Sequence, residues 1–477
     1  MLKNAMVYSD DTSKGRRGNE RSIFRGYIPL EDLQESAAWY LEDRVNDYGI
    51  ARIAQLRGDT AYASYFSKRA QNYVNLFSKS VGFFRGRNAD GSYRTSDADF
   101  KPNEWGYEFT EGAPWHYVAA ANHDPAGMMQ LYGGLEAFAA KLDDVLTAPP
   151  DFLKGSYSLV IHEMREGYDV GMGQYAHPNE PVHHMLYMYD YAGQPWKTQH
   201  YVRQVLSEER AIYTDGVGTG RGYLGDEDNG EMSAWYVFSA LGFYPASPGH
   251  DEYAIGSPLF PSAILHLDNG RTFTVRANNQ SDGNEYIQSA TLNGQPYDRA
   301  FLDHQTILQG GVLELRMGPT PSPWGSSIDA GPVKDVAPDS WDCAEAGFAT
   351  SGIGSEGHPE LAFDNDSRTA WERPAEGATL QYVWTKPSTC QSTLYTITSA
   401  AGSPDADPRD WELEALVPDN GWTTLDRRTE QQFSSRQQTR VFTIASPPQA
   451  FTQLRLRVSA NHGAPQTRIA EVEFLRR

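Results

Sequence analysis

The sequence predicts a multidomain protein: an α/α toroid of helical hairpins, then a β segment, and then an all-β sandwich. Apolar residues recur at spacings of three and four up to about residue 245, which is the period of amphipathic helices. From about residue 251 the period changes to two, which is typical of strands. The chain has 477 residues, which is too long for one compact domain.

Residues 30–245 are predicted to be mainly helical. One is expected over 33–48, and a second begins with Thr60 as its N-cap and keeps one apolar face as far as Phe77. The pattern over 128–145 predicts one continuous helix, and a further helix is expected at 231–241. Long polar loops separate these helices, at 83–116, 162–184 and 213–230. Helical hairpins separated by such loops predict a toroid with the loops gathered at one mouth.

The second half of the chain is predicted to form strands. Three of them fall at 271–277, 286–294 and 312–318. The segment 319–340 is rich in Pro, Gly and Ser, which is typical of a linker. Short alternating strands then continue to the C-terminus and predict a β-sandwich. The predicted divisions are a helical domain, a β segment that closes it, a linker and a sandwich, in the order 1–250, 251–330, 331–340 and 341–477.

Composition excludes several classes of function. A formal net charge of −21 makes nucleic acid and anionic membrane surfaces poor partners, so we expect neither. No stretch is apolar and long enough for a membrane helix, and the first residues show no apolar core of a secretion signal. The two cysteines, Cys343 and Cys390, exclude a disulfide scaffold and a cysteine-rich zinc cluster. One disulfide and two free thiols both remain open.

Two acidic sites stand out. Glu111 lies in EFTEGAPWHY, a tight and partly apolar turn, where desolvation raises a carboxyl pKa and so suits a proton donor. A solvated loop acid has the same signature. In GDEDNG, the three acids Asp226, Glu227 and Asp228 precede a helix. They either cap that helix, or bind a cation or hold a water as general base.

A third cluster combines histidines with acids and an amide: His162, Glu163, His177, Asn179, Glu180, His183 and His184. The spacing is not that of a zinc-protease helix, and oxygen ligands from Asn179 and Glu180 suit a hard cation better. Histidines in a cleft either bond sugar hydroxyls or pack between helices. Two separate carboxylates on loops at one mouth are the minimum for glycoside cleavage, one as acid and one as base or nucleophile.

Five segments carry a resemblance that runs from about residue 1 to residue 330: RGYIPLEDLQESAAWYLEDRVNDYGIARIAQLRGD, YEFTEGAPWHY, GQYAHPNEPVHH, YDYAGQPWKTQ and RGYLGDEDNGEMSAWYVFSALGFYP. They resemble glycoside hydrolase family 92. This family consists of exo-acting, calcium-dependent, inverting α-mannosidases, in which an (α/α)6 toroid follows a β-sandwich. The resemblance therefore implies the same toroid that the helical hairpins predict.

The resemblance also implies a role for each candidate residue. Glu111 matches the general acid, and Asp228 matches the general base, with Asp226 as its catalytic companion. His162 and Glu163 look like the pair that shapes the leaving-group subsite in members that cut α-1,2 links. The implied substrate-binding residues are His162, Glu163, His177 and Trp115, and the implied ligands of Ca²⁺ are Asn179, Glu180 and Asp226. The metal would hold the mannose 2- and 3-hydroxyls and help to flatten the ring.

The chain departs from the family pattern in two ways. EGAPWHY and HPNEP stand where EGNAWQY and HGNEP are usual, which affects the expected leaving-group preference while the acids are kept. Family members also carry a β-sandwich and helical hairpins before the segment that opens this chain. We therefore expect an N-terminally incomplete toroid that is a poor enzyme alone, with a second chain as the partner that supplies the missing half.

Residues 341–477 resemble a discoidin-like domain of the factor 5/8 C type, a group that includes family 32 carbohydrate-binding modules. The resemblance is carried by LAFDNDSRTAW, DPRDWELEAL, TRVFTI, FTQLRLRV and IAEVEFL. Asp364, Asp366 and Thr369 look like the turn that often holds a structural cation in such domains, and an ordinary Asx turn fits equally well. The domain is expected to attach the enzyme to glycans.

Together these observations predict an exo-acting, α-1,2-specific α-mannosidase that removes terminal mannose from N-glycans or mannans with inversion. Mannose-containing glycans are its expected partners, and the family resemblance places it in an extracellular or periplasmic location. The alternative is a catalytically impaired fragment that acts as a glycan-binding protein.

Overall fold

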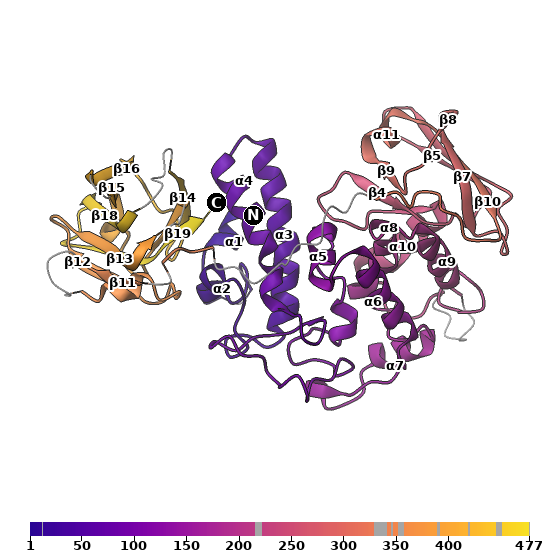
Figure 1. Cartoon of the computed structure of the whole chain (residues 1–477), viewed down its shortest axis with the longest axis horizontal. Helices are drawn as coiled ribbons and strands as arrows, with labels where there is room; N and C mark the ends of the chain where they lie inside the picture. The colour runs from indigo at the N-terminus through magenta and orange to yellow at the C-terminus, as the bar shows by residue number, and fades with distance from the viewer. Residues whose placement is uncertain are drawn as a thin grey trace. The chain divides into compact units, whose positions relative to one another are not determined.

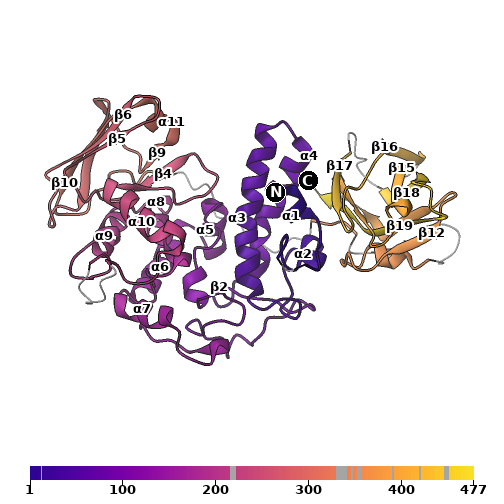
Figure 2. The same cartoon turned by 180° about the vertical axis from the view of Figure 1, so that it is seen from behind.

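The computed structural model describes the chain except for residues 12, 215–221, 329–340, 345–346, 352–356, 389–391, 418–419, 445–450 and 477. The chain forms two compact units that do not follow its order (Figures 1 and 2). One unit contains residues 1–33, 46–75 and 338–477, and the other contains 34–45 and 76–337. The long helix α3 (Ser36–Leu56) contributes residues to both units.

The first unit begins with α1 (Leu2–Met6) and α2 (Asn19–Arg25), and α3 is followed after a short turn by α4 (Thr60–Ala70). The predicted hairpin is therefore confirmed, but Thr60 is not the N-cap. Asp59 is the cap, because its carboxylate reaches the Tyr62 amide at 3.2 Å. The helix also stops before Phe77. A 3-10 turn replaces its last predicted part, and Phe77 lies in the two-residue strand β1 (Phe77–Ser78) of the second unit.

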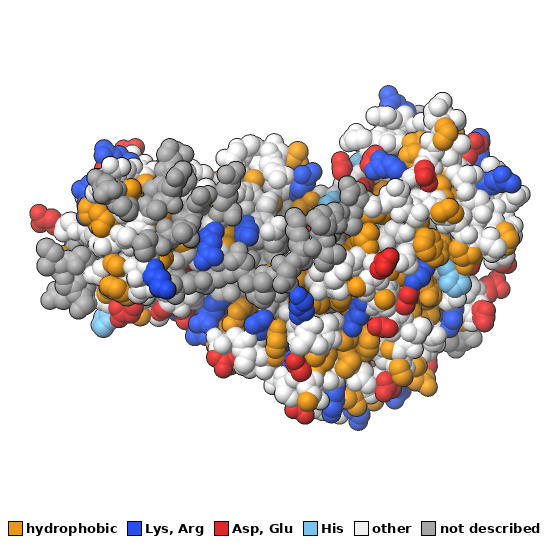
Figure 3. All heavy atoms as spheres, in the orientation of Figure 1, with side chains coloured by type: hydrophobic (Ala, Val, Ile, Leu, Met, Phe, Trp, Pro, Cys, Tyr) orange, Lys and Arg blue, Asp and Glu red, His pale blue; other side chains and the backbone are white. Residues whose placement is uncertain are grey.

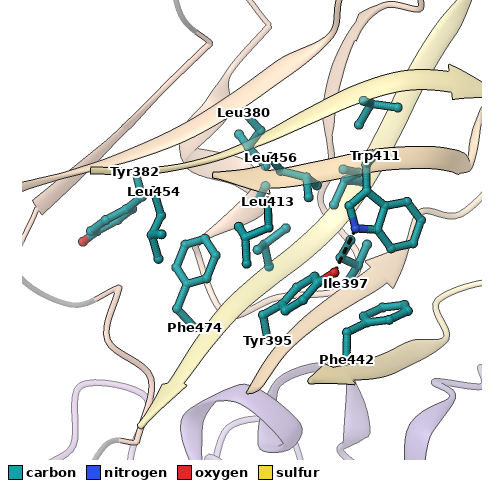
Figure 4. Packing of buried hydrophobic residues seen from close by; sticks show 14 of the residues in the cluster. Leu380, Tyr382, Tyr395, Ile397, Trp411, Leu413, Phe442, Leu454, Leu456 and Phe474 are labelled. Carbon is teal, nitrogen blue, oxygen red and sulfur yellow. Dashed lines mark hydrogen bonds between the residues drawn. The ribbon is translucent and has the colours of Figure 1, made fainter. Parts of the chain in front are cut away.

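The C-terminal residues form the predicted β-sandwich. Its sheets have the strand orders β11-β13-β18-β15-β16 and β12-β19-β14-β17. The strands are β11 (Gly347–Thr350), β12 (Trp371–Pro374), β13 (Thr379–Ser388), β14 (Ser392–Ser399), β15 (Pro408–Val417), β16 (Gly421–Arg428), β17 (Thr439–Thr443), β18 (Phe451–Asn461) and β19 (Gln466–Arg476). Figure 4 shows the core between the sheets, where the Trp411 indole donates to Tyr395 Oη at 3.0 Å. Cys343 is disulfide-bonded, and Cys390 lies outside the described residues.

The second unit contains the other helices: α5 (Pro125–Tyr132), α6 (Leu135–Thr147), α7 (His162–Val170), α8 (Met188–Tyr191), α9 (Pro195–Val205), α10 (Glu231–Leu241) and α11 (His304–Gln309). The single helix predicted over 128–145 is wrong. Gly133 and Gly134 adopt positive φ angles of 99° and 111°, which separate α5 from α6 although the apolar spacing continues. Helix α10 has its predicted bounds. The loop predicted at 162–184 opens with α7.

Packing pairs α5 with α6 and α8 with α9. These two helix pairs do not establish a toroid, so the toroid stays a prediction. None of the helices in the described residues is long and apolar enough to cross a membrane. On the face drawn in Figure 3, acidic and basic side chains are interspersed.

The second unit contains two larger sheets, with the strand orders β5-β6-β10-β7-β8 and β3-β4-β9. It also contains the separate short pair β1-β2. The strands are β2 (Phe83–Phe84), β3 (Phe243–Tyr244), β4 (Glu252–Ile255), β5 (Ser262–His266), β6 (Thr272–Asn278), β7 (Tyr286–Leu292), β8 (Gln295–Pro296), β9 (Phe301–Asp303) and β10 (Gly311–Gly318). Trp324 is buried in this core and donates from Nε1 to Tyr297 O at 2.7 Å. The first part of the predicted linker therefore packs on the sheets, whereas 331–340 lies outside the described residues.

Candidate active site

A cavity of about 630 Å³ lies within the second unit. Its wall combines one face of α3, the turn around Glu111, the segment from Asn179 to His184, the start of α10 and the residues after β3. This volume is typical of a site for a small molecule. The wall residues that matter most for its chemistry are Trp39, Glu42, Glu111, Asn179, Glu180 and Glu231.

Glu111 is fixed in a left-handed backbone conformation, with a φ of 44°. A residue that carries a side chain rarely adopts this conformation unless its surroundings hold it there. Its amide donates to Tyr157 Oη at 2.7 Å, and its carbonyl accepts a bond from Asn179 Nδ2 at 2.7 Å. The backbone is thus held on both sides of a side chain that is exposed to the cavity.

The pKa of Glu111 is raised, first by partial burial and then by the charges of Glu163, Glu180 and Asp228. The direction predicted from the sequence is therefore confirmed. Partial burial, followed by the charge of Asp226, also raises the pKa of Asp228. Since the charge of Asp228 acts on Glu111, the two predicted catalytic carboxyls share one electrostatic environment. Their roles as acid and base stay predictions.

The turn before α10 gives Asp228 a distinctive geometry. Asp228 and Asn229 both have left-handed φ angles, of 51° and 58°. Of the three acids, Glu227 takes the capping function, because its carboxylate accepts bonds from the Ser233 amide at 3.1 Å and from Ser233 Oγ at 2.7 Å. Neither aspartate of the motif is the cap of α10.

Helix α7 presents His162 and Glu163 at its first two positions. His162 Nε2 lies 3.0 Å from Glu163 Oε1 and 3.9 Å from Asp226 Oδ2. A bond between His162 Nδ1 and Glu166 Oε2 at 3.0 Å is the main reason that the pKa of His162 is raised. The structure therefore brings the predicted leaving-group pair to the aspartate turn, although neither residue lines the cavity.

His177 and Trp115 do not reach the cavity. The side chain of His177 is fully buried, with its ring nitrogens bonded to Tyr175 Oη at 2.8 Å and Tyr213 Oη at 2.9 Å. Burial lowers its pKa well below the usual range. The packing alternative therefore replaces the substrate-binding prediction for His177. Trp115 packs instead against the ring of Phe83 and the Lys141 ammonium.

Helix α3 supplies two wall residues that sequence reasoning missed. Trp39 and Glu42, three positions apart, both line the cavity, and the Trp39 side chain is 38% exposed. Desolvation, and then neighbouring carboxylates, raise the pKa of Glu42 to about 6. The available signal was their i, i+3 spacing on the face opposite the apolar one, since such neighbours share one helix surface.

His183 belongs to the predicted histidine cluster, but its partner Glu231 was missed. His183 is 1% exposed, and its Nδ1 lies 2.7 Å from Glu231 Oε1 in the cavity wall. Its Nε2 lies 2.8 Å from the carbonyl oxygen of His177, which only accepts, so Nε2 carries a proton. Nδ1 then either donates to a carboxylate or accepts from a carboxylic acid. In both cases the pair holds one shared proton and has no net charge.

The predicted calcium ligands are only partly brought together. Among the described residues, no three His, Cys, Asp or Glu side chains are grouped as a metal site, and Asp226 is exposed outside the cavity wall. Asn179 and Glu180 do share the wall. Of the described residues that line it, none is a lysine or arginine. A wall rich in carboxylates with raised pKa values fits a hard cation, held by Glu180 and by Asn179 Oδ1.

The sandwich contains a separate candidate cation site. Glu471 of β19 is fully buried, and among the described residues neither of its carboxyl oxygens has a hydrogen-bond partner. Burial, and then the charge of Asp364, raise its pKa well above the usual range. Thr369 Oγ1 donates to Asp364 Oδ2 at 2.8 Å, whereas Asp366 is paired with Arg21 and Arg368. Asp364 and Glu471 therefore fit a cation better than Asp366 does.

Comparison with known proteins extends this picture. The chain is 30% identical over 361 residues to an uncharacterised secreted glycosidase of Arthroderma benhamiae, a match that covers 68% of this chain and 42% of the relative. It also matches the structure of a family GH92 inverting mannosidase from Bacteroides thetaiotaomicron, with 42% identity, a TM-score of 0.59, and coverage of 70% of this chain and 44% of that one.

A family GH92 α-mannosidase from the same bacterium matches with 31% identity, a TM-score of 0.57, and coverage of 66% of this chain and 39% of that one. The chain thus spans about two-fifths of the length of these relatives. In its C-terminal part it matches a family 32 carbohydrate-binding module from C. perfringens, with 19% identity and a TM-score of 0.22 over 27% of this chain and 90% of that one.

The family model for the glycosyl hydrolase family 92 catalytic domain matches residues 1–319, a span that contains the whole cavity wall and the aspartate turn. This chain therefore belongs to glycosyl hydrolase family 92.

Proposed function

We propose that this protein is an exo-acting, α-1,2-specific α-mannosidase that removes terminal mannose from N-glycans or mannans with inversion. The observation that carries the proposal is the cavity in which Glu111 has a raised pKa and is held by Asn179, while the charge of Asp228 acts on it. Family membership supports the same reaction class, since the bacterial relatives above are described as mannosidases and one of them as inverting.

In the proposed reaction, protonated Glu111 donates its proton to the glycosidic oxygen as the bond to the anomeric carbon breaks. Asp228 removes a proton from a water molecule that attacks the same carbon from the opposite face. The released mannose then has the inverted anomeric configuration. Asp228 ends the cycle protonated and Glu111 ionised, and proton exchange with solvent restores both groups.

Each environment suits its role. Partial burial and three nearby carboxylates keep Glu111 protonated to a higher pH than an ordinary glutamate. A calcium ion bound by Glu180 and Asn179 would supply positive charge that orients the sugar hydroxyls. His162 and Glu163 would contact the sugar on the leaving-group side.

The test is mannose release from α-1,2-mannobiose, followed by NMR so that the anomer formed first is visible. We expect β-mannose, and loss of turnover in Glu111→Gln and in Asp228→Asn. Glu136→Gln, an exposed acid on α6, is the matched control and should retain activity. Binding of mannosides without turnover would instead support the glycan-binding alternative. Full activity of Glu111→Gln would contradict the assigned acid.

We also propose a location outside the cytoplasm. The fungal relative is described as secreted, and Cys343 is disulfide-bonded, a state that persists mainly in oxidising compartments. Thiol titration of the protein isolated from its native source under alkylating conditions tests this proposal. A reactive Cys343 thiol in that material would contradict it.

A further inference from the structure

The outer face of the sheet β12-β19-β14-β17 is buried. In a two-sheet sandwich this face normally meets water and carries polar side chains. Here the strand register places Leu394, Val441 and Leu475 on that face, and each is at most 8% exposed. Glu473, on the same face two residues before Leu475, is fully buried. The face therefore has the burial of an interior.

Helices from the beginning of the chain, within the same unit, cover this face. One hydrophobic cluster joins the three sheet residues to Trp341 and to residues of α1, α3 and α4: Ala5, Met6, Ile50, Ala51, Tyr65 and Phe66. The Tyr65 and Trp341 rings lie 5.2 Å apart. Apolar burial of this kind is the main favourable term in association.

Polar contacts surround the apolar cluster. The Tyr8 amide donates to Gln437 O at 3.3 Å, and the Ser367 amide donates to Glu20 O at 2.9 Å. Arg21 Nε of α2 lies 3.1 Å from Asp366 Oδ2 in the sandwich. These bonds fix the position of the sandwich on the helices and strengthen its attachment to them.

Buried ion pairs order the helix side of the contact. Arg69 of α4 is 1% exposed, and its Nε lies 2.9 Å from Asp47 Oδ2 of α3. Arg16 Nη1 lies 2.5 Å from Asp47 Oδ1. Burial, and then the charge of Asp342, raise the pKa of Glu473 in the sandwich, and the charge of Arg69 partly opposes this rise.

We infer that the C-terminal sandwich is a structural partner of residues 1–75, docked on α1, α3 and α4 through the outer face of its four-stranded sheet. Non-covalent contacts alone hold it there, so the covalent connection through 329–340 is not what keeps the two together. The inference does not depend on the proposed catalytic function, and it gives the sandwich a role beside any binding of glycans.

The test is to cut the connection in the folded protein. A sequence for a site-specific protease is placed within residues 331–337 of the full chain, and the cleaved protein is run on a size-exclusion column at low micromolar concentration. We expect the two fragments to elute together and to unfold in one thermal transition. Separation into two folded fragments would overturn the inference.

Two variants locate the contact. Val441→Asp places a charge in the cluster and should weaken the association of the cleaved fragments by about a hundredfold or more. Thr423→Asp, an exposed position in β16 of the other sheet, is the matched control and should keep them together. Tyr62→Ala, on the helix side of the cluster, is the milder second variant if Val441→Asp does not fold. Unchanged association in Tyr62→Ala and in folded Val441→Asp would contradict the proposed face.

Discussion

Asn179 Nδ2 donates a hydrogen bond of 2.7 Å to the backbone carbonyl of Glu111, and so joins the predicted cation segment to the predicted acid. Asn179→Ala should lower kcat/KM on an aryl α-mannoside by about tenfold to a hundredfold, because Glu111 loses the bond that fixes its strained backbone. Asn122→Ala is the matched control. Asn122 lines the same cavity and also bonds a backbone carbonyl, that of Ala246. Equal losses in both variants would contradict a specific role for Asn179.

The second prediction concerns the pH profile. Glu111 must be protonated to act as the acid, so its pKa sets the alkaline limb of kcat/KM. Glu163 is the charge that raises this pKa most. Glu163→Gln removes a negative neighbour, stabilises ionised Glu111 and should move the alkaline limb to lower pH, by less than about one unit. A pH–rate series on the wild type and the variant checks this. An unchanged limb would mean that another group controls it.

The third prediction separates two tryptophans. Trp39→Ala should raise KM about tenfold with little change in kcat, because the ring in the cavity wall offers a sugar an apolar face. Trp39→Phe should recover part of that loss. Trp115→Ala should leave KM nearly unchanged, since its ring is engaged with Phe83 and Lys141. Steady-state kinetics of the three variants give the answer, and a larger effect at Trp115 would favour the sequence prediction over the structure.

Local features of the sequence predicted much of the fold. Helix α10 was predicted with its bounds because Gly242 ends an unbroken apolar period, and the sandwich followed from alternation alone. The raised pKa of Glu111 followed from an apolar turn. The break at Gly133–Gly134 was missed because the apolar spacing continues across it, and only the backbone angles reveal it.

Other features depend on contacts between distant segments. A buried histidine and a cavity histidine look alike in sequence, so His177 could not be told from a ligand of substrate. Leu394, Thr396 and Thr398 read as an ordinary strand face, and their burial becomes visible only when the helices of residues 1–75 are in place. Trp39 was missed because the prediction used only the apolar face of the helix, and Trp39 lies on the opposite face.

The fourth prediction concerns the sandwich cation site. Calcium in large excess over its dissociation constant should raise the Tm of the chain by about 5 °C, because it binds the folded chain, where it replaces the proton on the buried carboxyl of Glu471. Glu471→Gln should abolish the shift, and a chelator should reverse it in the wild type. Glu360→Gln changes an exposed acid just before the turn that contains Asp364, and this variant should behave as the wild type. A calcium shift that survives in Glu471→Gln would place the cation elsewhere.

The fifth prediction is a pH dependence of stability at the docked face. Burial, and then the charge of Asp342, raise the pKa of Glu473 to about 8 from an ordinary 4.5. Between these values the folded state holds a proton that the unfolded state has released. The free energy of unfolding therefore falls as the pH rises through this window, by about 1.4 kcal/mol per pH unit from this group. Below the window the contribution is fully present.

Urea unfolding across this pH range measures that slope. In Glu473→Gln the neutral amide cannot titrate, so the curve should become flatter by about one proton. Glu376→Gln, an exposed acid of the same sandwich, should leave the slope as in the wild type. Other groups, including Glu471, titrate in both proteins, so the difference between the two slopes isolates Glu473. Parallel curves for wild type and Glu473→Gln would show that Glu473 releases its proton as readily in the folded state as in the unfolded one.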